Sequence, residues 1–358
     1  MFKPCITARM SFPLSDHCNG KTFFNPGQRA ERGLLGLLRW KLTSRASPWP
    51  RWVELAPSAP PPPAGEGEIV ATWINHATFL LQTPSGNFLT DPVFSERTSP
   101  VSWAGPRRVH APGVAFDDLP KIDGVLLSHD HYDHCDLPTL QRLASTHQPL
   151  VLAPLGHRAL LAAAGITRVV DLDWWQTHAW TPGISVTLTP ARHWCRRRAG
   201  GTNHRLWAPR IHPKHTPISC RRAGGTNHRL WGGFFLRSGA QSAYFVGDSG
   251  YDAALFPLIS ERLGAPDLAL IPIGAYEPRW FMRSAHMNPA ESVQVHRDLG
   301  AKVSVGMHWG CWRLTDEGRD DPPRALAEAR QAAGIAEADF RILTPGESVT
   351  CGNRTGSR

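Results

Sequence analysis

The stretch IDGVLLSHDHYDHCD, residues 122–136, places four residues of metal-binding types directly after an apolar run. The apolar run predicts a buried strand. His129 and His131 are separated by one residue, so an extended backbone points both imidazoles to the same side, toward one ion. Asp133 and His134 are adjacent and diverge, so they can serve a second ion. Imidazole nitrogen and carboxylate oxygen suit Zn²⁺ at about 2.0–2.2 Å, and the stretch therefore predicts a zinc site.

Three further residues of the same kind stand at the ends of apolar segments later in the chain. His193 follows ISVTLTPA, Asp248 ends SAYFVGD, and His308 ends KVSVGMH. Taken alone, each is more often an ordinary histidine or aspartate. Taken together, in this order after H-x-H-x-D-H, they predict a site with two metals, built where strands end.

The pattern of apolar segments predicts a layered α/β protein. The segment 69–91 reads as two strands joined by a Pro-Ser-Gly-Asn turn, and residues 122–173 alternate strand and helix. Further helices are expected at 137–146 and around 253–263, 288–298 and 323–333.

The order of these residues resembles that of metallo-β-lactamase-fold hydrolases. More narrowly, the chain is similar to the N-acyl-phosphatidylethanolamine-hydrolysing phospholipase D group. The shared motifs are TWINHAT (72–78), LTDPVF (89–94), SHDHYDHCD (128–136), ARHWC (191–195), VGDSGY (246–251), IPIGAYEPRWFM (271–282), HMNPAES (286–292) and MHWG (307–310). The resemblance implies an α/β fold, a four-layer αββα sandwich with the metals at one edge.

The resemblance also implies two Zn²⁺ per chain and a division of the ligands between them. One ion would be held by His129, His131 and His193, and the other by Asp133, His134 and His308. Asp248 would bridge the two. The catalytic residues implied are Asp133, Asp248 and His286, with a metal-bridging hydroxide as the attacking group.

The implied activity is that of a zinc-dependent phosphodiesterase of phospholipase D type, acting on N-acylphosphatidylethanolamine-like phospholipids. Two alternatives stay open, because one fold hosts many activities. One is hydrolysis of a lactone or another carboxylic ester. The other is a metal-binding protein that is catalytically silent because of an insertion.

Several residues near these motifs are weaker candidates. Asp91 is expected to orient a ligand histidine, with a simple turn residue before Pro92 as the alternative. His76 could support a ligand in the same way or be an ordinary turn histidine. Asn288, beside His286, could donate to a phosphoryl oxygen or cap a helix. The cleft is expected to be lined by Tyr276, Arg279 and Trp280, for which a purely structural role is an equal reading.

The chain divides by composition into an arm and a body. Residues 1–65 predict an irregular, basic N-terminal arm that ends in a proline-rich linker, and residues 66–350 predict the catalytic domain. Within the arm, residues 31–45 combine leucines with arginine and lysine. They predict a helix that either packs on the domain or makes peripheral contact with a membrane.

An eleven-residue sequence occurs twice. RRAGGTNHRLW stands at 197–207 and again at 221–231. Only two copies exist, so a repeat protein is excluded and a tandem duplication is indicated. The sequence predicts an exposed insertion near 197–220. The first copy is expected to keep the upstream contacts and the second copy the downstream ones.

Composition and charge indicate which partners and which location to expect. The formal charge of +9 favours anionic partners. The basic residues do not alternate with an aromatic platform, so no nucleic-acid partner is expected. Seven cysteines without a C-x-x-C pair argue against a disulfide framework. The sequence shows no secretory signal and no membrane span, so a cytoplasmic protein is expected, with peripheral contact at the inner face of the membrane as an alternative. The oligomeric state stays open.

Overall fold

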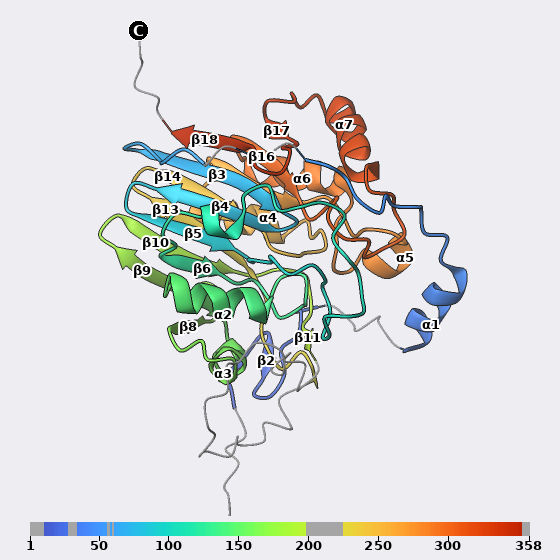
Figure 1. The fold of residues 1–358 in the computed structure, drawn as a ribbon, viewed down its shortest axis with the longest axis horizontal. Helices are drawn as coiled ribbons and strands as arrows, with labels where there is room; N and C mark the ends of the chain where they lie inside the picture. The colour runs from blue at the N-terminus through green and yellow to red at the C-terminus, as the bar shows by residue number, and fades with distance from the viewer. Residues whose placement is uncertain (1–10, 28–33, 56–57, 59–60, 198–224, 353–358) are drawn as a thin grey trace, which may run out of the picture.

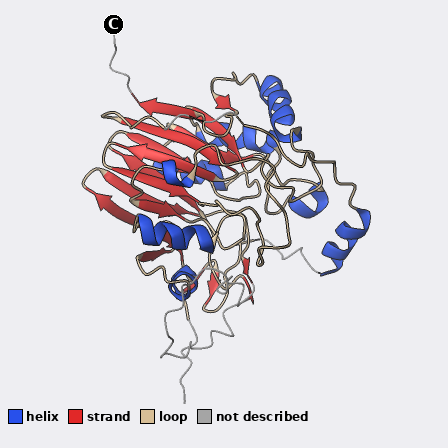
Figure 2. Cartoon of the chain, in the orientation of Figure 1, coloured by secondary structure: helices blue, strands red, loops and turns tan. Residues whose placement is uncertain are grey.

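The computed structural model describes residues 11–27, 34–55, 58, 61–197 and 225–352. Two seven-stranded sheets form its centre, with helices on both sides (Figures 1 and 2). The fold is therefore the expected α/β sandwich of four layers, helix–sheet–sheet–helix.

The first sheet has the strand order β18-β3-β4-β5-β6-β7-β8. Its strands are β3 (Glu68–Asn75), β4 (Thr78–Thr83), β5 (Gly86–Thr90), β6 (Gly124–Leu126), β7 (Leu150–Pro154), β8 (Val169–Leu172) and β18 (Ser348–Gly352). Strands β5 to β8 are parallel, and β18, β3, β4 and β5 pair antiparallel.

The second sheet has the order β17-β16-β15-β14-β13-β10-β9. Its strands are β9 (Thr177–Thr181), β10 (Ile184–Thr189), β13 (Gly233–Ser238), β14 (Gln241–Phe245), β15 (Leu268–Pro272), β16 (Val303–Met307) and β17 (Phe340–Arg341). Strands β14 to β17 are parallel. Each sheet thus has a parallel half, and loops that follow parallel strands leave at the same edge.

The helices cover the outer faces of both sheets. The first sheet carries α2 (Leu137–Thr146) and α3 (His157–Ala163), and the second carries α4 (Leu255–Leu263), α6 (Pro289–Leu299) and α7 (Asp321–Ala333). Smaller elements are α1 (Leu34–Thr43), α5 (Arg279–Met282), the 3₁₀ turn Phe116–Asp118, and the short strands β1 (Leu14–Ser15), β2 (Cys18–Asn19), β11 (Arg196–Arg197) and β12 (Gly225–Thr226). None of the helices in the described ranges is long and apolar enough to cross a membrane.

Alternation of side chains along the strands builds two apolar layers. Phe79 and Leu81 of β4 point into the core between the sheets, whereas Leu80 points outward, into the layer beneath α2. In β6 the order is reversed, with Leu126 inside and Val125 outside. A strand buried on both faces needs apolar residues at successive positions, which explains its continuous apolar sequence.

One expectation about the strands was wrong. Residues 69–91 form three strands, because the chain turns tightly between Asn75 and Thr78. His76 at this turn has a φ of 43°. The turn carries neither glycine nor proline, and Asn75 alone is a weak sequence signal of a turn. The strand β9 was not foreseen either.

Part of the N-terminal segment packs on the body. The rings of Phe12 and Phe23 lie 4.7 Å apart, and Phe23 is buried in the core between the sheets. Asn25 donates from its side chain to the carbonyl of His193, at 2.9 Å. The division of the chain at residue 65 remains a prediction.

The duplicated segment enters the body at both of its ends. Arg196 and Arg197 of β11 pair with Thr226 and Gly225 of β12. The second copy continues from Thr226 through Trp231 into β13. Residues 198–224, with most of the first copy and the greater part of the predicted insertion, lie outside the described residues.

Candidate metal centre

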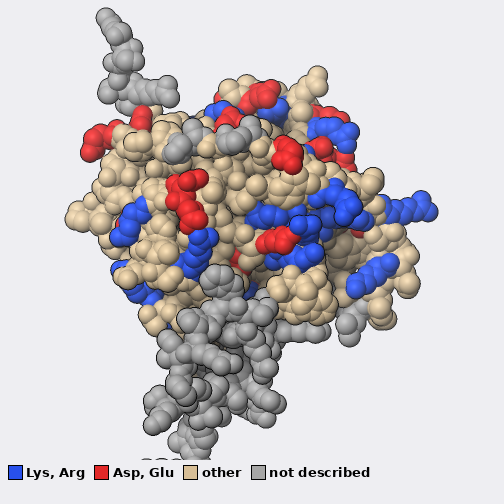
Figure 3. Space-filling view, viewed as in Figure 1, with Lys and Arg blue, Asp and Glu red and all other residues tan. Residues whose placement is uncertain are grey.

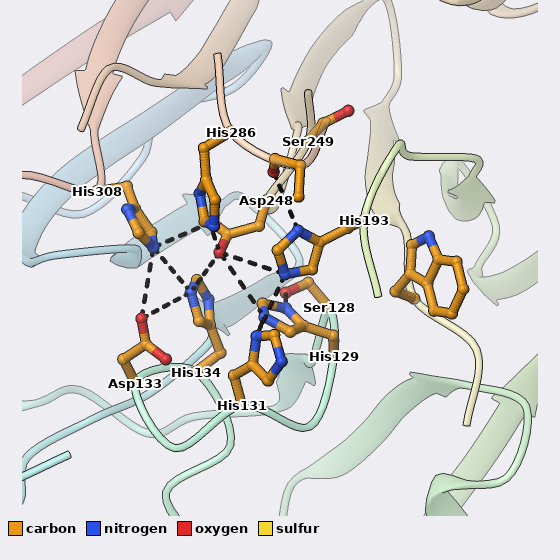
Figure 4. Close-up of polar contacts among 12 residues, drawn as sticks. Ser128, His129, His131, Asp133, His134, His193, Asp248, Ser249, His286 and His308 are labelled. Carbon is orange, nitrogen blue, oxygen red and sulfur yellow. Dashed lines mark hydrogen bonds and ion pairs between the residues drawn. The ribbon is translucent and has the colours of Figure 1, made fainter. Parts of the chain in front are cut away.

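Seven side chains that the sequence singled out meet at one edge of the sandwich (Figure 4). They lie on loops that follow the strands β6, β10, β14 and β16. All but two are almost fully buried. They are His129, His131, Asp133, His134, His193, Asp248 and His308.

The first group consists of three imidazoles. His131 Nδ1 lies 3.0 Å from His129 Nε2 and 3.2 Å from His193 Nε2. Two atoms bound to one tetrahedral zinc at about 2.0–2.1 Å are about 3.3 Å apart. The three nitrogens are therefore spaced as ligands of a single ion would be.

The second group consists of Asp133, His134 and His308. Asp133 Oδ2 lies 3.4 Å from His134 Nε2 and 3.5 Å from His308 Nε2, and these two nitrogens are 3.1 Å apart. The spacing again matches the edges of a tetrahedral site.

Asp248 stands between the two groups, as Figure 4 shows. Its Oδ2 is 3.2 Å from His134 Nε2, and 3.8 and 3.7 Å from the Nε2 atoms of His129 and His193. Its Oδ1 is 3.1 Å from His308 Nε2. A carboxylate in this place can contact an ion in either group.

Hydrogen bonds on the far side of the rings determine which nitrogen faces the centre. His193 Nδ1 donates to the carbonyl of Ala285 at 3.0 Å, and His134 Nδ1 donates to Asp91 Oδ2 at 2.6 Å. In a neutral imidazole the other nitrogen then carries a lone pair. The Nε2 atoms of both rings thus face the centre, and outer partners of this kind are typical of metal ligands.

Asp91 also orients His129, through Ser128. The Ser128 hydroxyl donates to Asp91 Oδ2 at 2.5 Å and so can only accept from His129 Nδ1, which is 2.8 Å away. Asp91 further accepts from the backbone N–H of Ser128, at 2.7 Å. The structure thus places Asp91 in contact with His134, one of the histidines predicted to bind metal.

Burial and charge decide the protonation of the centre. Burial lowers the pKa values of His129 and His131, which favours the neutral rings that metals bind. Burial would raise the pKa values of Asp133 and Asp248, but the histidines around them, above all His134, hold both well below the usual range. The carboxylates therefore stay ionised and make the centre attractive to cations.

His76 and His308 lie against each other on the Asp133 side. Burial lowers the pKa of His76 to about 3, so the ring is neutral and can donate from Nε2 to Asp133 Oδ2 at 3.1 Å. Burial opposes protonation of His308 too, but Asp248 and Asp133 outweigh it and raise its pKa to about 9. Both residues have positive φ values, 43° and 63°, a strained conformation that is common at functional sites.

A cavity of about 700 Å³ opens above the centre. Its polar floor includes His131, Asp133, His193, Asp248, His286 and His308. Its walls are largely apolar and are drawn from distant parts of the chain, with Phe24, Leu37, Trp40, Phe281, Met282 and Leu314 among them. The cavity suits a molecule with one polar group and a long apolar part.

Among the weaker candidates, His286 lines the cavity and the others do not. His286 lines the cavity with Nδ1 3.9 Å from Asp248 Oδ2. Asn288 instead caps α6, in a reciprocal pair of hydrogen bonds with Glu291, and Arg279 binds the same Glu291. Tyr276, Arg279 and Trp280 are not among the residues that line the cavity.

Most of the apolar wall could not be predicted from the sequence. Leu37 and Trp40 belong to α1, and Trp40 packs on Phe281 with their rings 5.2 Å apart. Phe24 belongs to the sequence Phe-Phe-Asn-Pro at residues 23–26, and nothing in its spacing indicated a cavity.

Comparisons with known proteins agree with this geometry. Residues 86–309 match the β-lactamase superfamily domain. The chain is 36% identical over 293 residues to N-acyl-phosphatidylethanolamine-hydrolyzing phospholipase D 1 of Caenorhabditis elegans, covering 79% of this chain and 76% of that protein. It is 29% identical over 270 residues to the mitochondrial phospholipase D of the same description from Saccharomyces cerevisiae, covering 74% of this chain and 53% of the yeast protein. Igni18, a metallo hydrolase from Ignicoccus hospitalis, has a similar fold, with a TM-score of 0.55, 19% identity, and coverage of 80% of this chain and all of Igni18.

Proposed function

Because this chain belongs to the β-lactamase superfamily and is a metal-dependent hydrolase of the metallo-β-lactamase fold, we propose that it is a zinc-dependent phosphodiesterase of phospholipase D type. Its substrates would be N-acylphosphatidylethanolamine-like phospholipids. The similarity to two phospholipases that are named for this activity supports the substrate class.

One observation carries the proposal: two ligand groups share Asp248 on the floor of a cavity with apolar walls. A phospholipid has a phosphodiester at the end of long acyl chains. The diester would meet the polar floor, and the chains would lie against residues such as Leu37 and Phe281.

We assign the seven residues as the ligands of two zinc ions. His129, His131 and His193 would hold one ion, Asp133, His134 and His308 the other, and Asp248 both. When bound, such a pair supplies Lewis acidity and lowers the pKa of a coordinated water. Asp91 and His76 would keep His134 and Asp133 in orientation through the hydrogen bonds described above.

His286 is proposed to act on the substrate directly. Its ring lines the cavity beside Asp248. The residue lies in the loop before α6, where the backbone N–H of Met287 donates to the Ser249 carbonyl at 3.0 Å. From this place it could donate to a phosphoryl oxygen as negative charge develops.

A purified, metal-analysed protein tests the proposal. We expect about two zinc ions per chain. We also expect metal-dependent release of phosphatidic acid from N-acylphosphatidylethanolamine, and turnover of bis-p-nitrophenyl phosphate. Turnover of a lactone with no hydrolysis of either phosphodiester would reject the phosphodiesterase in favour of a carboxylic ester hydrolase. Absence of any turnover by a zinc-loaded protein would favour the silent protein.

We also propose that α1 contacts a lipid surface at the inner face of the membrane. Leu35, Leu38 and Leu42 are 82%, 54% and 84% exposed and follow each other at helical spacing. Exposed apolar side chains at such spacing, accompanied by Arg39 and Lys41, are typical of helices that lie in a membrane interface. The opposite side of α1 forms part of the cavity wall, so lipid could pass directly from the surface to the centre.

The α1 contact predicts a measurable loss of membrane binding. Replacing Leu35 and Leu42 by serine should weaken sedimentation with phosphatidylglycerol vesicles about 10-fold or more, because two leucines lose their apolar burial. Hydrolysis of soluble bis-p-nitrophenyl phosphate should be unchanged. Leu14→Ser, at a residue that is 80% exposed on β1, is the matched control. Equal vesicle binding by all three proteins would remove α1 as the contact.

A further inference from the structure

Two buried arginines lie behind the turn that carries four of the proposed ligands. Arg197 and Arg229 are each 5% exposed. Arg197 stands in the first copy of the duplicated sequence and Arg229 in the second. The pairing of β11 with β12 brings the two copies to the same side of the turn.

Arg229 neutralises the residue between the first two ligands. Its Nη1 donates to Asp130 Oδ2 at 2.7 Å, and Asp130 is fully buried. Asp130 lies between His129 and His131, so its side chain points away from the metal centre. The ion pair therefore holds the backbone between His129 and His131 in place from the side opposite to the two imidazoles.

Arg197 joins the two ends of the same turn. Its Nη1 donates to the backbone carbonyl of Asp130 at 3.0 Å and to that of Cys135 at 2.8 Å. Its guanidinium lies 4.3 Å from the centre of the Tyr132 ring. Between these two carbonyls along the chain lie three proposed ligands, His131, Asp133 and His134.

We propose that Arg197 and Arg229 are positioning residues, which clamp the H-x-H-x-D-H turn in the conformation that binds metal. The clamp takes one arginine from each copy of the duplication. This inference rests on the metal site proposed above. A planar guanidinium can hold two carbonyls and stack on a ring at once, which explains arginine at position 197.

The duplication supplies matched controls within the same chain. The counterpart of Arg197 in the second copy is Arg221, and the counterpart of Arg229 in the first copy is Arg205. Both counterparts lie outside the described residues, and the contacts with the turn described above are those of Arg197 and Arg229. Four variants follow: Arg197→Met, Arg229→Met, Arg221→Met and Arg205→Met.

Cobalt binding to the metal-free protein separates the two pairs. Titration with Co²⁺, followed by its visible absorption, should give affinities about 10- to 100-fold weaker for Arg197→Met and Arg229→Met, as for other residues that support metal ligands. Arg221→Met and Arg205→Met should match the parent protein. Arg229→Lys, which keeps the charge beside Asp130, should recover most of the lost affinity. Parent-like cobalt binding by all variants would overturn the clamp.

Hydrogen exchange is a second measurement, which tests the clamp even if one variant does not fold or the parent protein binds no cobalt. In the metal-free protein, the amides of residues 129–135 should exchange faster in Arg197→Met and Arg197→Lys. The control for this comparison is Arg221→Met. Unchanged exchange there would also overturn the clamp, even if Arg229→Met does not fold. A parent protein that binds no cobalt would contradict the metal site, and hydrogen exchange would still decide on the clamp.

Discussion

Asp91 is the residue on which the orientation of two proposed ligands depends. It receives a hydrogen bond from His134 directly and acts on His129 through the Ser128 hydroxyl. Its φ of 32° is costly for a residue with a side chain, and its carboxylate is fully buried. Strain and burial at one residue are tolerated here because its carboxylate satisfies several donors at once.

His286 allows substrate chemistry to be separated from metal binding. We expect His286→Ala to lower kcat about 100- to 1000-fold, the usual loss when one donor to a developing oxyanion is removed. The metal content should remain that of the parent protein, because the other seven residues are unchanged. The measurement is steady-state kinetics together with metal analysis. Loss of metal from His286→Ala would instead make His286 a ligand, a place that its distance from Asp248 also allows.

At the scale of elements, the N-terminal hairpin is attached to the body through a histidine. His17 Nδ1 lies 2.6 Å from Asp16 and Nε2 lies 2.8 Å from Asp173, and its ring stacks on Trp174. Burial opposes protonation of this ring, but the contacts with Asp173 and Asp16 outweigh it and raise the pKa of His17 above its ordinary value. Protonated His17 therefore links β1 and β2 to the loop after β8.

This link should depend on pH. A raised pKa in the folded state means that the stabilisation is complete below about pH 6.5, the pKa of an unfolded histidine, and is lost as the pH rises through the folded pKa. The free energies of unfolding of the parent and His17→Gln should therefore differ most at pH 5.5–6 and converge at higher pH. Urea unfolding across this range provides the measurement. A difference that is constant with pH would show that His17 acts by packing alone.

The β11–β12 hairpin explains where the duplication can be tolerated. Trp231 of the second copy donates to the Ala191 carbonyl at 2.9 Å, and a Cβ on the next residue, Gly232, would lie 2.4 Å from the Thr189 carbonyl oxygen. The entry to β13 thus has no space for extra residues. Arg197 and Gly225 are paired at the described end of the hairpin, where additional chain displaces none of these contacts.

Removing the extra chain should leave the fold intact. Deletion of residues 198–221 leaves Arg222, Ala223 and Gly224 between the two short strands, a three-residue loop with glycine available for the left-handed position. Loop-closure entropy favours the shorter loop by about 2 kcal/mol, so the Tm should be equal or a few degrees higher. Metal content and phosphodiesterase activity should persist. Calorimetry and kinetics test this, and a deleted protein that loses its metal would show that the extra chain supports the site.

At the scale of the whole molecule, the candidate centre joins the two sheets. Its ligands come from loops after β6 of one sheet and after β10, β14 and β16 of the other. Ions held there would bind only the folded chain. Figure 3 shows that Lys and Arg side chains gather in several groups on one face of the molecule, with acidic side chains among them.

Metal removal should therefore destabilise the whole fold. At an ion concentration about 100 times the Kd, each site adds about 2.7 kcal/mol, so a chelator should lower the Tm by several degrees. Added zinc should restore it. Asp248→Asn is the matched control, because its Tm should respond less to the chelator. An identical Tm with and without chelator would contradict a metal centre shared by the two sheets.

The sequence by itself selected the candidate metal-binding residues, but it said less about their surroundings. Ligand type and spacing are local properties, so H-x-H-x-D-H and the strand-end residues His193, Asp248 and His308 could be selected before any contact was known. The helix at 137–146 was likewise predicted at its true bounds, because its apolar period is local.

Tertiary structure decided what lies around those ligands. The turn at His76, the role of Asn288 as a helix cap, and the cavity wall formed by Phe24, Leu37 and Trp40 depend on packing between segments far apart in the chain. The same holds for Arg197 and Arg229, each of which has a counterpart in the other copy of the same eleven-residue sequence. No local rule can distinguish identical copies, because only their position in the folded chain determines which arginine reaches the turn.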